Sequence, residues 1–123
     1  MRITREAFEK LVAQALEGLP AEFAEKLENV EVVVADAPAP ADLGERQLPE
    51  GDLLLGLYHG VPLTRRSVWG GSLFPDRITI YQRAVELVSR TPQEMIENVR
   101  RTVLHEIAHH FGISDARLRE LGY

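Results

Sequence analysis

The most informative stretch of this sequence runs from Thr91 to Asp115, TPQEMIENVRRTVLHEIAHHFGISD. It contains the segment HEIAH at residues 105–109. Histidines four residues apart on an α-helix lie about one turn apart on the same face, so both imidazoles can reach one metal ion. Glu106 projects about 100° further round the helix, where it can reach a water molecule held by the metal. This spacing predicts a zinc site with Glu106 as the catalytic general base.

The same stretch carries the signals of a long helix. Thr91 is a favourable N-cap, Pro92 stands at the first helical position, and Glu94 completes a capping box. A stripe of apolar residues at helical spacing predicts the face that packs on the core; its members are Ile96, Val99, Val103, Ile107 and Phe111. The two histidines fall on the opposite face, which is therefore expected to line a cleft.

A third metal ligand is needed, since catalytic zinc usually binds three protein groups and keeps one position for water. In a continuous helix Asp115 would point roughly 120° away from His109. Gly112 removes this obstacle, because a glycine just past a helix end readily takes the left-handed conformation and reverses the chain. We therefore expect one zinc ion bound by His105, His109 and Asp115. Other first-row metals such as cobalt or manganese also suit these ligands, so the choice of zinc stays open.

Together, five residues resemble the extended motif HExxHxxGxxD of zincin metallopeptidases of the metzincin-like kind, in the variant with Asp in place of the third His, as in snapalysin; they are His105, Glu106, His109, Gly112 and Asp115. The chain length and the run PDRITIY at residues 75–81 also resemble the small bacterial zincin-like proteins sometimes called minizincins. This resemblance implies a zincin fold, one zinc ion, and hydrolysis of a peptide or an unfolded protein. Metzincins carry a methionine turn after the third ligand, whereas Met1 and Met95 both precede the motif here. We therefore expect weak, latent or narrowly specific activity.

The hypothesis for catalysis is that Glu106 takes a proton from the zinc-held water as it attacks the peptide carbonyl, and then passes it to the leaving amine. A second donor to the developing oxyanion is expected, and the sequence leaves four candidates open: Tyr58, His59, Tyr81 and Tyr123. If a strand edge lines the cleft, an extended substrate can bind by adding a strand to it. The alternative function is a zinc-binding domain with a structural or regulatory role and little proteolysis. The acid beside the first histidine favours the peptidase.

Two further residues near these motifs have an open role. His110 lies beside the apolar stripe, which favours a core histidine, or one that supports a ligand, over a metal ligand. Trp69, followed by two glycines, either contacts the substrate as part of a lid or packs on the body of the domain.

The remaining sequence predicts one α+β domain over residues 1–123, with a three-stranded sheet covering the apolar face of the metal-binding helix. Periodicity and breakers predict helices at 4–18, 20–27 and 115–121, strands at 30–35, 53–61 and 77–82, and loops at 36–52 and 62–76. In the third strand, Ile78 and Ile80 are expected to face inward, and Thr79 and Tyr81 outward. Residues 84–90 are compatible with either a helix or an extended run.

Composition excludes several classes of protein. The net charge of −5 argues against a nucleic-acid binder, which needs a basic surface to neutralise phosphates. The chain has no cysteine, so disulfide scaffolds and thiolate metal sites are excluded. The charged N-terminal residues do not form a secretory signal, and no apolar run is long enough to span a membrane. We therefore expect a soluble cytoplasmic protein without a membrane partner, and the oligomeric state stays open.

Overall fold

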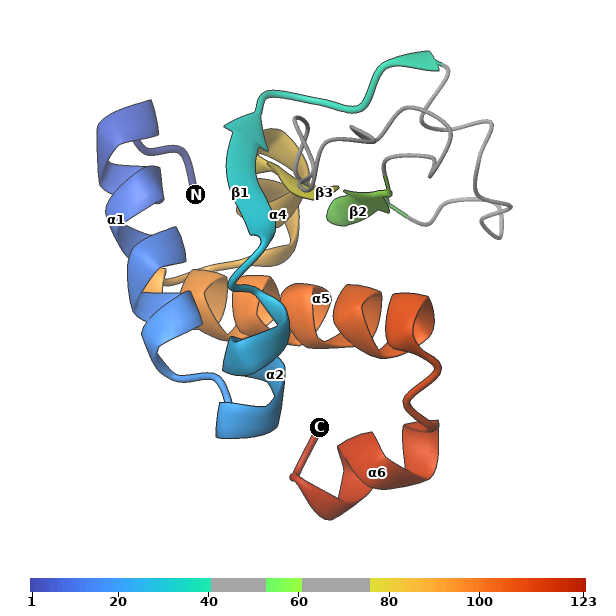
Figure 1. The fold of residues 1–123 in the computed structure, drawn as a ribbon. Coiled ribbons are helices and arrows are strands. Elements are labelled where there is room, and N and C mark those ends of the chain that lie inside the picture. The colour runs from blue at the N-terminus through green and yellow to red at the C-terminus, as the bar shows by residue number, and fades with distance from the viewer. Residues whose placement is uncertain (41–52, 61–75) are drawn as a thin grey trace.

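A computed structural model describes residues 1–40, 53–60 and 76–123 of the chain (Figure 1). Most of the two predicted loops, Trp69 included, lies outside the described residues. The secondary structure comprises α1 (Arg5–Glu17), α2 (Ala21–Lys26), β1 (Val30–Ala35), β2 (Gly56–His59), β3 (Asp76–Tyr81), α4 (Gln82–Val88), α5 (Pro92–Phe111) and α6 (Asp115–Glu120). The predicted α+β architecture, with a three-stranded sheet packed on helices, is confirmed. Residues 84–88 of the undecided run 84–90 belong to a helix, α4, and of the predicted strand 53–61 only residues 56–59 form β2 among those that the structure describes.

Local capping interactions fix both ends of α5. At the start, the Thr91 hydroxyl accepts the Glu94 N–H at 3.1 Å, and the Glu94 carboxylate accepts the Arg90 N–H at 3.1 Å. At the end, Gly112 takes the left-handed conformation, with φ 71° and ψ 26°. Thr4 caps α1 in the same way as Thr91, by accepting the Ala7 N–H at 3.1 Å. Each of these contacts joins residues only a few positions apart in the chain. The sequence alone therefore predicts where α1 and α5 begin and where α5 ends.

The sheet has the strand order β1-β3-β2, with β1 parallel and β2 antiparallel to the central strand β3. Ile78 and Ile80 of β3 are fully buried in the main core, as predicted. Thr79 and Tyr81 face the other side of the sheet, but they are only 9% and 1% exposed, so the expectation that both point outward is wrong with respect to solvent. The reason is a second, smaller apolar cluster, in which Tyr81 packs with three residues: Leu54, Leu57 and Ala84.

The helix α5 runs beneath the sheet, and α1 crosses its first half (Figure 1). Val99, Val103 and Ile107 are fully buried, which confirms most of the predicted apolar stripe. Phe111 departs from it, since this residue is 44% exposed. It sits in the last turn of α5, where its ring meets the Tyr58 and His110 rings edge-on and lies 5.0 Å from the Lys26 ammonium group.

Two charged side chains join segments that are far apart in the sequence. The Arg100 guanidinium of α5 reaches the C-terminal end of α1, where Nε donates to the Ala15 carbonyl at 3.1 Å. The Glu86 carboxylate of α4 accepts hydrogen bonds from the Ile3 N–H at 3.0 Å and from the Gln82 amide at 3.2 Å, and pairs with the Arg83 guanidinium at 3.3 Å. Glu86 is therefore a buried carboxylate with several partners, 3% exposed.

The Glu86 contacts predict a pH dependence of stability. Burial works to raise the pKa of this carboxyl, but the hydrogen bonds from Ile3, Gln82 and Arg83 outweigh it and hold the pKa below its ordinary value. A carboxyl with a lowered pKa stabilises the fold above its unfolded-state pKa, and this contribution is lost as pH falls through the folded-state pKa. Glu86→Gln should therefore cost about 1–2 kcal/mol at pH 7 and progressively less below about pH 4.

Urea unfolding of the wild type and of Glu86→Gln over pH 7 to 3 measures this difference, because the other carboxyl groups cancel between the two proteins. A gap in unfolding free energy that stays constant over the whole range would show that Glu86 ionisation does not contribute.

Candidate metal and catalytic site

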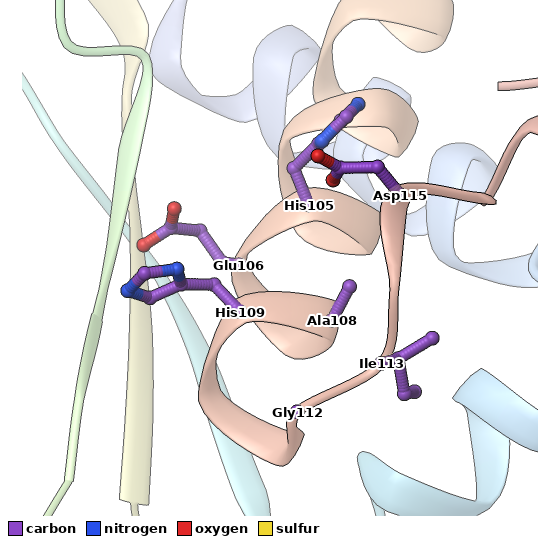
Figure 2. Close-up of a pocket in the computed structure, with 7 residues that line it drawn as sticks. All are labelled: His105, Glu106, Ala108, His109, Gly112, Ile113 and Asp115. Atoms are coloured by element: carbon purple, nitrogen blue, oxygen red, sulfur yellow. The ribbon is translucent and has the colours of Figure 1, made fainter. Parts of the chain in front are cut away.

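A pocket of about 370 Å³ opens at the C-terminal half of α5. Its lining comprises His105, Glu106, Ala108, His109, Gly112, Ile113 and Asp115 (Figure 2). The helix supplies the two histidines one turn apart, and the chain segment after it supplies the aspartate. The three predicted ligands and the predicted general base therefore line one pocket.

The turn at Gly112 is what returns the chain to this pocket. With φ 71°, the residue occupies the left-handed region, and the Ile113 N–H closes the turn by donating to the Ala108 carbonyl at 2.8 Å. A Cβ atom added at Gly112 would meet nothing within 4 Å, so the backbone conformation, and not a lack of space, favours glycine here. Beyond the turn, the Ser114 hydroxyl caps α6, and Asp115 is the first residue of that helix.

The side chains of the three predicted ligands, His105, His109 and Asp115, do not point toward one common position. Figure 2 shows the His105 ring and the Asp115 carboxylate on one side of the pocket, whereas the His109 ring points toward the strands, beside Glu106. Among the described residues, no three His, Cys, Asp or Glu side chains stand close enough together to hold a metal ion. All three predicted ligands are exposed, so packing does not oppose rotation of their side chains.

Glu106 contrasts with the ligands in being buried, at 5% exposure. Its Oε1 atom accepts the backbone N–H of Tyr58 on β2 at 2.9 Å. This bond links α5 to β2 across 48 positions of sequence. The general-base candidate is therefore held in a defined position between the helix and the sheet.

Tyr58 also connects the pocket to His110. Its hydroxyl donates to Asp76 Oδ2 at 2.7 Å, and its ring stacks on the His110 ring with a centroid distance of 3.9 Å. The His110 Nε2 atom lies 3.9 Å from the same Asp76 oxygen. His110 is thus a surface residue packed on Tyr58, and the expectation of a core histidine is wrong. No local pattern in the sequence relates Asp76 to either ring, so the sequence does not predict these contacts.

The chain is similar to known proteins over the residues that form the sheet and the pocket. The sequence profile described as zincin-like metallopeptidase matches residues 27–123, which include both the sheet and the whole pocket. The chain belongs to the zincin-like metallopeptidase family. A solved structure, a conserved hypothetical protein from Thermus thermophilus, is similar to this zincin-like chain with 30% sequence identity and a TM-score of 0.56. The similarity covers 89% of this chain and 94% of that one. No curated protein matches the chain.

Zincin-like proteins generally bind zinc, and the donor set of this zincin-like pocket suits that metal. Two imidazoles and one carboxylate are established zinc ligands, and three protein ligands leave one coordination position for water. The chemistry of the donors therefore fits zinc. The three side chains would have to rotate to reach one ion.

The second oxyanion donor of this zincin-like protein stays a prediction. None of the four candidates lines the pocket. The Tyr58 hydroxyl donates to Asp76, and Tyr81 is buried in the second apolar cluster. Tyr123 packs against the main core beside α6.

Within the described ranges, no helix combines the length and the apolar character required to cross a bilayer.

Proposed function

We propose that this zincin-like protein is a zinc-dependent peptidase that hydrolyses peptide bonds in peptides or unfolded proteins. His105, His109 and Asp115 hold one zinc ion, and Glu106 is the general base. The observation that carries the proposal is the pocket that these four residues line together, with Asp115 brought there by the left-handed turn at Gly112. The family match supports the same class of chemistry.

When bound, zinc supplies Lewis-acid chemistry, in which it makes water easier to deprotonate and polarises the substrate carbonyl. Glu106 accepts a proton from the attacking water and returns it to the nitrogen of the leaving amine. The Tyr58 N–H fixes one oxygen of this carboxylate, so the proton acceptor does not have to be ordered when the substrate arrives. The exposed rings of His105 and His109 can turn toward the Asp115 carboxylate without disturbing the core.

A second function, a structural or regulatory zinc-binding domain, is supported by one specific observation. Because Glu106 joins α5 to β2 through the Tyr58 N–H, a carboxylate at this position also has a purely structural use. The acid next to the first histidine therefore does not by itself distinguish a peptidase from a structural zinc domain.

Metal removal tests the proposal. We expect purified protein to contain one zinc ion per chain by elemental analysis, and to cleave an unfolded substrate such as fluorescently labelled casein. Dialysis against a chelator should abolish cleavage, and added zinc should restore it. Cobalt and manganese, added in parallel, identify which metals support activity.

The two functions give different results in this experiment. Full zinc occupancy without cleavage would favour the structural zinc domain. Failure to bind zinc even after reconstitution would contradict both.

A further inference from the structure

A second pocket adjoins the candidate site on the N-terminal side of His105. It has a volume of about 260 Å³ and shares His105 and Glu106 with the first pocket. Its remaining lining comes from the segment around the start of β2 and from the middle of α5: Leu53, Leu54, Leu55, Gly56, Asn98, Arg101 and Thr102. A group bound in this pocket would therefore lie next to the proposed reacting centre.

One wall of this pocket is apolar. It is formed by three consecutive leucines, of which Leu54 is buried at 6% exposure, whereas Leu53 remains 46% exposed. An exposed leucine at the mouth of a pocket is a favourable contact for an apolar group of a ligand. The wall can therefore bury the aliphatic part of a substrate side chain.

The polar wall contains a cation, Arg101. The Asn98 amide already donates to the Ser89 hydroxyl at 2.9 Å, and the Thr102 hydroxyl donates to the Asn98 carbonyl at 2.7 Å. Within residues 1–40, 53–60 and 76–123, no hydrogen bond or ion pair engages the Arg101 guanidinium. The guanidinium of its neighbour Arg100, by contrast, is hydrogen-bonded to the Ala15 carbonyl at the end of α1. The pocket thus combines apolar side chains with a guanidinium whose donors are available for an anion.

Arg101 lies four residues before His105, which corresponds to about 6 Å along the helix axis. The Glu106 carboxylate, which also lines the pocket and comes five residues after Arg101 on α5, repels an anion. A bound carboxylate is therefore expected at the Arg101 end, where charge-assisted and bidentate hydrogen bonds are available.

We propose that this pocket is a specificity subsite for a substrate residue beside the scissile bond, and that Arg101 pairs with a carboxylate on that residue. The inference rests on the proposed peptidase function. The carboxylate has two sources, which share one chemistry: the side chain of an internal glutamate, or the free C-terminus of a substrate that ends in an apolar residue. Arg101 is a specificity-determining residue in either case.

The test uses a series of quenched fluorogenic peptides that differ at single positions around the cleaved bond, with Glu, Gln, Leu or Lys at each position. Every peptide is made with a free and with an amidated C-terminus. At one position, we expect the wild type to cleave the carboxylate peptide at least about 10-fold better, in kcat/KM, than its uncharged isostere. A preference for Glu that survives amidation identifies the internal side chain. A preference confined to the free acid identifies the C-terminus.

Arg101→Gln should remove this preference while the uncharged peptides are still cleaved, and Arg101→Glu should shift it toward Lys. Arg119→Gln on α6, which changes the net charge equally outside the pocket, is the matched control and should leave the preference intact. Thermal unfolding of each variant checks that the fold is retained.

Binding separates this inference from the proposed catalysis. Fluorescence anisotropy with zinc-reconstituted Glu106→Gln protein compares the affinity for the Glu and Gln peptides without turnover. Arg101-dependent binding of the carboxylate peptide, without cleavage by the wild type, would support the subsite and reject the peptidase. A carboxylate preference that persists in Arg101→Gln, or its absence from both cleavage and binding, would overturn the subsite.

Discussion

Glu106→Gln is expected to lower kcat for peptide cleavage by roughly 100- to 10,000-fold, while zinc content and the free energy of unfolding stay close to the wild-type values. The glutamine side chain keeps a carbonyl oxygen, so it can still accept the Tyr58 N–H that Glu106 accepts at 2.9 Å. It cannot take a proton from water. This substitution therefore removes the proposed catalytic role and preserves the structural one.

Glu106→Ala is the informative partner of that variant. Alanine removes both the proposed catalytic role and the structural role of Glu106. It takes away the carboxylate that accepts the Tyr58 N–H, at a position where the native side chain is only 5% exposed. We expect a loss of about 1–3 kcal/mol in unfolding free energy, measured by urea denaturation of the metal-free proteins. If Gln retained full activity while Ala lost stability, Glu106 would be a structural link between α5 and β2, and the zinc-domain alternative would be favoured.

The parts of the fold that the sequence predicts are those determined by neighbouring residues. The starts of α1 and α5 follow from the capping hydroxyls of Thr4 and Thr91, and the turn that ends α5 follows from Gly112. Each of these residues acts on backbone groups only a few positions away. The alternation in β3 correctly predicts which side chains enter the main core. For the same reason, the return of Asp115 to the pocket that both histidines line could be anticipated from one glycine.

The features that the sequence does not predict depend on residues that are distant in the chain. Nothing near Tyr81 in sequence indicates that Leu54 and Leu57 cover it, and nothing near Phe111 indicates that the last turn of α5 is left partly uncovered. The hydrogen bond from Tyr58 to Glu106 joins residues far apart in the chain, and it gives the general-base candidate a second, structural use. The direction of the His109 ring, which points toward the strands, likewise does not follow from the spacing of the motif.

Asp115→Ala is expected to weaken zinc binding by at least about 100-fold, because loss of a direct ligand should exceed the effect of losing a group that only supports one. Competition with a chromophoric chelator measures the affinity. Asp115→His restores a nitrogen donor at the same place and should recover most of it. Glu120→Ala removes another carboxylate from α6, one that pairs with Arg117 at the surface, and it should bind zinc like the wild type.

The stability of the metal-free proteins keeps the role of Asp115 as a ligand separate from its role in α6. Asp115 stands in the first turn of that helix, where a negative charge is worth about 0.3–1 kcal/mol, so Asp115→Ala should unfold slightly more easily even without zinc. That small change cannot account for a 100-fold loss of affinity, which corresponds to about 2.7 kcal/mol. Wild-type affinity in Asp115→Ala, together with loss of binding in His105→Ala and His109→Ala, would mean that another group completes the site. The left-handed turn at Gly112 would then direct the chain into α6 without contributing to the metal centre.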